Sequence, residues 1–296
     1  MIFTSVLTAM RGYRPSPGRG VSRILVSGIV AGLGLALAAL TSIPVAAEAP
    51  QISARRAIER KTFTDAQITD GFFKIAFGAE FHIAGRVDRI RKYAGPVRVY
   101  VDSQAKPDRR DQVAEVVADI RSRIKHLDIA MAQERESANV VVTLVRDRDL
   151  GKTIRTLYGR DRARQIQRSL EPQCLSGFRK DPEFRIIRSD VLLVVDSGDF
   201  IFYDCVYEEL LQALGPINDD PTVPWSMFND KIRMGFFDVY DQYLLNILYD
   251  PRVQAGMTRQ QVRALLPQIL PDVRAFVASM NDLNATSSGA PGRKRR

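Results

Sequence analysis

The sequence predicts a single α+β domain with a mixed β-sheet, covering residues 63–270 of the 296-residue chain. Short valine-rich runs, typical of buried strands, alternate with longer segments whose apolar residues recur at helical spacing. Hydrophobic residues make up 45% of the chain and charged residues 26%, as in ordinary globular proteins. The sequence contains neither an internal repeat nor a glycine-rich phosphate loop, so repeat architectures and common nucleotide-binding folds are not indicated.

The first 47 residues predict a secretory signal peptide. Four arginines and no acidic residue precede an apolar run from Ile24 to Ile43, and Val45 and Ala47 occupy the small positions of a cleavage site before Glu48. The apolar run is also about long enough to span a bilayer, so an uncut N-terminal anchor is the alternative. The first alternative predicts a periplasmic or secreted protein, and the second predicts a protein anchored in the inner membrane.

The elements of the domain follow in order after a lead-in at residues 48–62. Thr64 is expected to cap a helix that runs to about Phe77. Alternating valines predict a strand over residues 95–102, and apolar spacing predicts a helix over residues 109–127. Buried strands are expected at 138–145 and 189–196, then a helix around Cys205, a proline-rich loop, and helices at 238–250 and 258–266. Residues 271–296 are predicted to form a C-terminal extension that ends in a disordered basic tail.

Two cysteines, Cys174 and Cys205, lie in the part of the chain expected to be exported. In an oxidising compartment an even pair of cysteines predicts a disulfide. This bridge would join the start of one helix to the segment that precedes it, and two free buried thiols are the alternative.

The charge balance excludes nucleic acid as an expected partner. After residue 47 the chain has 39 basic and 34 acidic residues, a mild excess for a body of this size. The terminal "GRKRR" predicts a solvated tail, with contact to anionic lipid or surface polymer as the alternative. The stretch Arg146–Leu170 is also basic, but its interleaved acids favour a solvated helical face.

The stretch "YDCVYEELLQALGPINDD", residues 203–220, carries the candidate site. At about 100° per residue, the apolar side chains form one core-facing stripe, and Glu208 and Gln212 project together from roughly the opposite side. Glu209 lies between the two faces. Gly215 is a natural end for the helix, since glycine readily adopts positive φ. The residues of the stripe are Val206, Leu210, Ala213 and Leu214.

This region resembles the metzincin zinc peptidases, and among them the matrixin-like proteases. In their pattern H-E-x-x-H-x-x-G-x-x-H-D, the acid, glycine and final aspartate correspond to Glu209, Gly215 and Asp219. A buried methionine turn and a C-terminal helix follow in the family. The matching positions here are Met227, nine residues after Asn218, and the run from Asp241 to Tyr249. The segments "EELLQALG", "SMFND" and "LYDPR" are also similar to a group of uncharacterised secreted bacterial proteins known only as a domain of unknown function.

The three zinc histidines of the family are replaced by Glu208, Gln212 and Asn218. The chain has only two histidines, His82 and His126, and neither is near this helix, so a three-histidine zinc site is impossible. The resemblance therefore implies a zincin fold whose conventional zinc chemistry is lost, with Glu209 a remnant of the general base. The three replacements could form a polar hydrogen-bonded cluster.

A hard divalent cation, calcium or manganese, is the alternative occupant of this position. Its ligands would be oxygens of Glu208, Asn218, Asp219 or Asp220.

The sequence leaves three functions open. The first is a pseudo-metallopeptidase that serves as a binding or structural module for a protein or peptide ligand, which could add a strand to the sheet edge. The second is a metal-dependent hydrolase with a site around Glu208, Glu209, Gln212 and Asn218. The third is a cell-envelope adaptor that contacts anionic surfaces, including membranes, through its basic segments.

Overall fold

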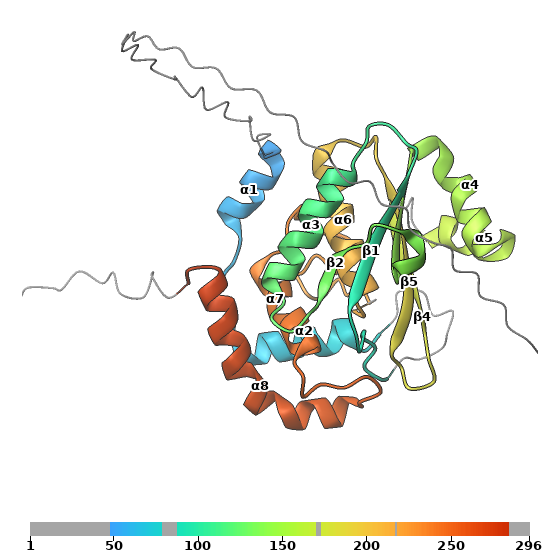
Figure 1. The fold of residues 1–296 in the computed structure, drawn as a ribbon. Helices are drawn as coiled ribbons and strands as arrows, with labels where there is room; N and C mark the ends of the chain where they lie inside the picture. Colours follow the sequence, from blue (N-terminus) through green and yellow to red (C-terminus); the bar gives the residue numbers. More distant parts are fainter. Residues whose placement is uncertain (1–47, 79–87, 170–172, 217, 284–296) are drawn as a thin grey trace, which may run out of the picture. The chain divides into compact units, whose positions relative to one another are not determined.

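The computed structural model describes residues 48–78, 88–169, 173–216 and 218–283 (Figure 1). The predicted signal or anchor, the basic tail and His82 lie outside these residues. Within the described part of the chain, no helix is both long enough and apolar enough to cross a membrane.

The predicted mixed sheet is confirmed and forms the centre of the domain. Its five strands are β1 (Val97–Ser103), β2 (Ile129–Met131), β3 (Val140–Val145), β4 (Cys174–Lys180) and β5 (Ile186–Val194), in the spatial order β2-β1-β3-β5-β4. Of these strands, β2 and β4 were not predicted. Parallel pairing joins β2, β1, β3 and β5, with Val99 opposite Val140 and Val142 opposite Val191. Only β4 runs antiparallel, and it lies at one edge.

The main core lies on one face of the sheet. Because side chains alternate along a strand, Val99, Val142 and Leu193 point to the same side. There they meet α3 (Arg110–Arg123) and α6 (Asp199–Ala213). The core continues into α2 (Asp65–Ala76), α7 (Val239–Tyr249) and α8 (Arg259–Met280). A short 3-10 helix, Arg135–Ser137, precedes β3.

A smaller apolar cluster covers part of the opposite face. Leu150 and Ile154 of α4 (Asp147–Tyr158) and Ala163 of α5 (Arg160–Ser169) pack on Leu192 and Val194 of β5. Figure 1 shows α4 and α5 on the other side of the strands from α3 and α6. This helix pair is thus attached to the sheet by its own apolar contacts, separate from the main core.

Helix α2 begins at the predicted cap, whereas the helices at the two ends of the described chain differ from the prediction. Thr64 caps α2 in a capping box, in which Thr64 Oγ1 accepts from the Gln67 N–H (3.2 Å) and Gln67 Oε1 accepts from the Thr64 N–H (3.0 Å). The lead-in contains a further helix, α1 (Pro50–Ile58).

Helix α8 is much longer than the predicted 258–266 and passes through Pro267 and Pro271. Its apolar residues Ile269, Val273 and Val277 remain buried, so packing outweighs the cost of the two prolines.

Candidate functional site

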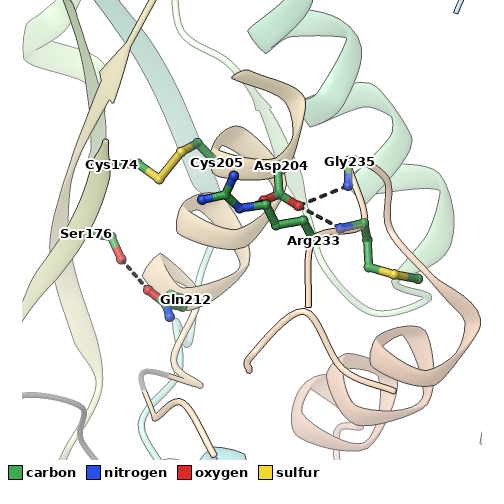
Figure 2. Close-up of a disulfide and its surroundings, with 8 residues drawn as sticks. Cys174, Ser176, Asp204, Cys205, Gln212, Arg233 and Gly235 are labelled. Carbon is green, nitrogen blue, oxygen red and sulfur yellow. Dashed lines mark hydrogen bonds and ion pairs between the residues drawn. A yellow bond between two sulfur atoms is a disulfide. The ribbon is translucent and has the colours of Figure 1, made fainter. Parts of the chain in front are cut away.

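Helix α6 is fixed to the edge strand β4 at two points. The predicted disulfide is confirmed, joining Cys174 of β4 to Cys205 of α6 with a Cα–Cα distance of 5.8 Å. Two residues further along the strand, Ser176 Oγ donates to Gln212 Oε1 at 3.3 Å. Figure 2 shows both links between the strand and the helix. The orientation of α6 relative to the sheet edge is therefore set by a covalent bond and a side-chain contact.

The side of α6 opposite its predicted core stripe is not open to solvent. Gln212 is only 3% exposed and Glu209 only 6%. The side from which Gln212 projects is covered by β4 and by the loop after the helix, where Gln212 Nε2 donates to both carboxylate oxygens of Asp219 (3.0 and 3.2 Å). Gln212 thus bridges the strand and the loop with both atoms of its amide.

Three carboxylates converge beside this bridge. One oxygen each of Glu208, Asp219 and Asp230 lies within 4.8 Å of the other two. Burial, followed by the nearby charges of Glu209 and Asp219, raises the pKa of Glu208 well above its ordinary range. Asp230 was not predicted as a site residue, although it is the last residue of the quoted "SMFND" segment. Because their negative charges repel one another, these three carboxylates favour binding of a proton or a cation between them.

The structure separates Asn218 from the cluster in which it was expected. Asn218 Nδ2 donates to the carbonyl of Lys74 in the last turn of α2 at 2.9 Å. Asp220, a candidate cation ligand, instead accepts from the N–H and Oγ1 of Thr222 (2.8 and 2.6 Å) in a local turn. Asp219 therefore takes the place beside Gln212 that the sequence analysis gave to Asn218.

Met227 lies in the turn-rich segment after α6 and is 2% exposed. Its N–H donates to Asp241 Oδ2 at 2.7 Å, and Ser226 Oγ donates to Asp241 Oδ1 at 2.6 Å. Asp241 is fully buried, and this burial raises its pKa to about 6. Two positions singled out by the family pattern thus contact each other directly and attach α7 to the methionine segment.

The end of α6 is attached to α7 as well. Tyr249 Oη donates to the carbonyl of Leu214 at 2.8 Å. Gly215 follows with φ of +137°, and a Cβ at this position would lie 2.2 Å from the carbonyl oxygen of Arg91. A glycine is therefore required here both by its backbone angle and by the close approach of another segment.

Asp204 is a buried acid of α6 that the sequence analysis did not single out. Its Oδ1 accepts from the N–H groups of Met234 and Gly235 (2.7 and 3.1 Å), and Arg233 Nε lies 3.9 Å from its Oδ2 (Figure 2). Burial raises the pKa of Asp204 to about 6. Its place one turn before Glu208 is the only signal in the sequence, and it adds negative charge to the same helix.

The donor set does not fit catalytic zinc. Zinc prefers imidazole nitrogens and thiolates, whereas the described groups here are carboxylates and a carboxamide whose N–H atoms point to Asp219. His126 is exposed and lines a separate cleft of about 570 Å³ together with Lys92, Tyr93 and Arg185. The residues that could act together are Glu208, Asp219 and Asp230 as oxygen donors, with Glu209 buried beside them.

A family model described as "Protein of unknown function (DUF2927)" matches residues 65–268 of the chain. The match includes all five strands, α6, the methionine segment and α7. No curated protein and no solved structure matches the chain.

Proposed function

We propose that this chain, which belongs to the DUF2927 family of proteins of unknown function, is an exported zinc-peptidase-like domain that has lost its zinc site and binds an extended peptide. Export is supported by the signal-like N-terminus and by the disulfide, because disulfides persist mainly in oxidising compartments. The relation to zinc peptidases is supported by the order of strands, buried helix, methionine segment and Asp241 helix.

The contacts of Gln212 are the main support for the proposed loss of the zinc site. Gln212 stands at the position of the second zinc histidine, and its amide is engaged by Ser176 on one side and Asp219 on the other. An amide held in this way cannot replace an imidazole, because its nitrogen has no lone pair for a metal. The position therefore fixes the edge strand to the loop in place of holding an ion.

The peptide-binding part of the proposal rests on the edge of β4. Within the described chain β4 pairs only with β5. The Val194 N–H donates to the Gln173 carbonyl (3.1 Å), and partners alternate between bonded and non-bonded pairs in an antiparallel ladder. The backbone N–H and C=O groups of Cys174, Ser176 and Phe178 are thus the ones directed away from β5. A row of this kind is what an incoming extended peptide pairs with.

Panning a random peptide library against the purified protein tests this function. Wild type is expected to enrich peptides that bind in extended form, and Ser176→Ala is expected to retain them. Ser176→Pro is expected to lose them, because proline removes the outward N–H and leaves the ladder to β5 intact. Failure to enrich any peptide, or equal binding by the two variants, would contradict the proposal. Thermal unfolding checks that both variants are folded.

A second candidate function, binding of a hard cation, is favoured by the convergence of Glu208, Asp219 and Asp230. Calorimetric titration with Ca²⁺ and Mn²⁺ tests it, with Asp230→Asn as the variant that should lose binding. Asp220→Asn is the matched control, because Asp220 is engaged with Thr222. No heat on titration of wild type would exclude this candidate.

A further inference from the structure

Three carboxyl groups gather at the start of α7. Asp238 is the N-cap of this helix and is 1% exposed, and its Oδ1 accepts from the N–H groups of Tyr240 and Asp241 (2.9 and 3.1 Å). Asp241 stands three positions after the N-cap, where a side chain can reach back to it. From the lead-in, Glu59 Oε1 accepts from the Val239 N–H at 2.7 Å. Three acids therefore share one helix start, and two of them have almost no access to water.

The two fully buried acids differ in the donors that they receive. Both oxygens of Asp241 accept, one from Ser226 Oγ and the other from the Met227 N–H. Asp238 Oδ2 is buried, and among the described residues no donor bonds to it. The side chains of Asp238 and Asp241 are nevertheless in hydrogen-bonding contact with each other. An ionised carboxylate can only accept, so this contact becomes a hydrogen bond only if one of the two acids keeps its proton.

The charged groups that face Asp238 do not compensate a negative charge. They are Asp241 and Glu59, which are both acidic. Burial, followed by the charge of Asp241, raises the pKa of Asp238 well above its ordinary range. Tyr240, a further titratable neighbour on α7, donates its hydroxyl to the Gln67 carbonyl at 2.7 Å. The basic residues of this region face Glu59, and they are Arg56, Lys61 and Arg123.

We propose that Asp238 Oδ2 carries a proton at neutral pH and donates it to ionised Asp241, so that one buried proton holds the methionine segment against the start of α7. The proton satisfies the oxygen that otherwise lacks a donor, and Asp241 remains able to accept from Ser226 and Met227. When the pH rises and the proton leaves, two carboxylates in contact repel each other in a buried place. The contact between the segment and α7 then weakens, which makes it sensitive to pH.

Chemical denaturation of wild type, Asp238→Asn and Asp241→Asn across neutral and alkaline pH tests the proposal. Asparagine is an equally good N-cap, and its amide N–H takes the place of the proton. Since the folded pKa of Asp238 is raised, its stabilisation is complete below the unfolded pKa and is lost as the pH rises through the folded pKa. Asp238→Asn is therefore expected to reduce the proton uptake on folding near pH 7 by about one proton. Asp241→Asn is expected to be destabilised throughout, because an amide cannot accept from Ser226 and Met227 with both of its polar atoms.

Asp111→Asn is the matched control, because it makes the same change at an exposed position in the first turn of α3. It is expected to leave the proton uptake unchanged.

Amide hydrogen exchange provides a second readout, which reports on the contact itself. At alkaline pH the Met227 N–H, measured relative to Val142 in the central strand β3, is expected to exchange several-fold faster in wild type than in Asp238→Asn. Proton uptake that Asp238→Asn does not change, or equal exchange at Met227 in the two proteins, would overturn the proposal. So would a loss of stability in Asp238→Asn as large as that in Asp241→Asn.

Discussion

At the scale of single residues, the candidate site depends most on Gln212, which connects two segments of the chain. Gln212 has the length to reach both β4 and the following loop, and its amide supplies a donor and an acceptor together. Histidine could not bond to Ser176 and to both oxygens of Asp219 with the same geometry. Under the proposed relation to zinc peptidases, the residue at the position of a metal ligand therefore helps to hold the edge strand in place.

Glu208 should make stability depend on pH. Its folded pKa is raised, so the protonated form contributes stability that is complete below the unfolded pKa and is lost as the pH rises through the folded pKa. Glu208→Gln is therefore expected to stabilise the protein at pH 8 by on the order of 1 kcal/mol and to have little effect near pH 4. Chemical denaturation at both values measures this, with exposed Glu136→Gln as control. A destabilised variant at pH 8 would contradict the expectation.

Gly215 gives a second prediction at this scale. Gly215→Ala should lower the free energy of unfolding by roughly 2 kcal/mol or more, because the new Cβ would lie 2.2 Å from the Arg91 carbonyl and φ is +137°. Gly95→Ala is the matched control, since its Cβ would enter open space. Urea denaturation of both variants measures this difference. Equal unfolding midpoints would contradict the prediction and would show that the segment at Arg91 can shift to accept the new Cβ.

At the scale of elements, the disulfide between β4 and α6 is expected to contribute most to the stability of the edge strand. An edge strand with a hydrogen-bonding row is stabilised on one side only, and the disulfide supplies a second attachment. Cys174→Ser/Cys205→Ser is expected to lower the free energy of unfolding by about 3–4 kcal/mol, from the loop of 31 residues that the bridge closes. Denaturant unfolding measures the loss. Amide hydrogen exchange should also quicken more in β4 than in β3, and an unchanged β4 would show that the strand does not depend on the bridge.

At the scale of the whole molecule, two apolar clusters lie on opposite faces of one sheet. Helix α6 belongs to the main core, and the α4–α5 pair has a separate apolar attachment. Strand β4 contacts both clusters, since Leu175 lies in the smaller one while Cys174 and Phe178 pack against the main core. The peptide-binding proposal therefore concerns the outer edge of β4 and not the sheet face that α4 and α5 cover.

Much of this fold could be predicted from the sequence because its signals are local. Valine-rich runs located β1, β3 and β5, and the Thr64 capping signal located the start of α2. Strand β4, "CLSGFRK", has no apolar alternation and exists through its pairing with β5. The burial of Gln212 could not be foreseen either, since a helical projection treats α6 alone and the covering segments come from β4 and a later loop.

The most direct test of the central claim is the metal content of the protein by mass spectrometry. The protein is purified without affinity-tag histidines, incubated with zinc and dialysed, alongside Glu209→Gln and Gln212→Ala variants. We expect the zinc content to be well below one ion per chain and to be the same in all three proteins. One zinc ion per wild-type chain, lost in the Gln212→Ala variant, would contradict the proposed loss of the zinc site and would indicate an active metallopeptidase.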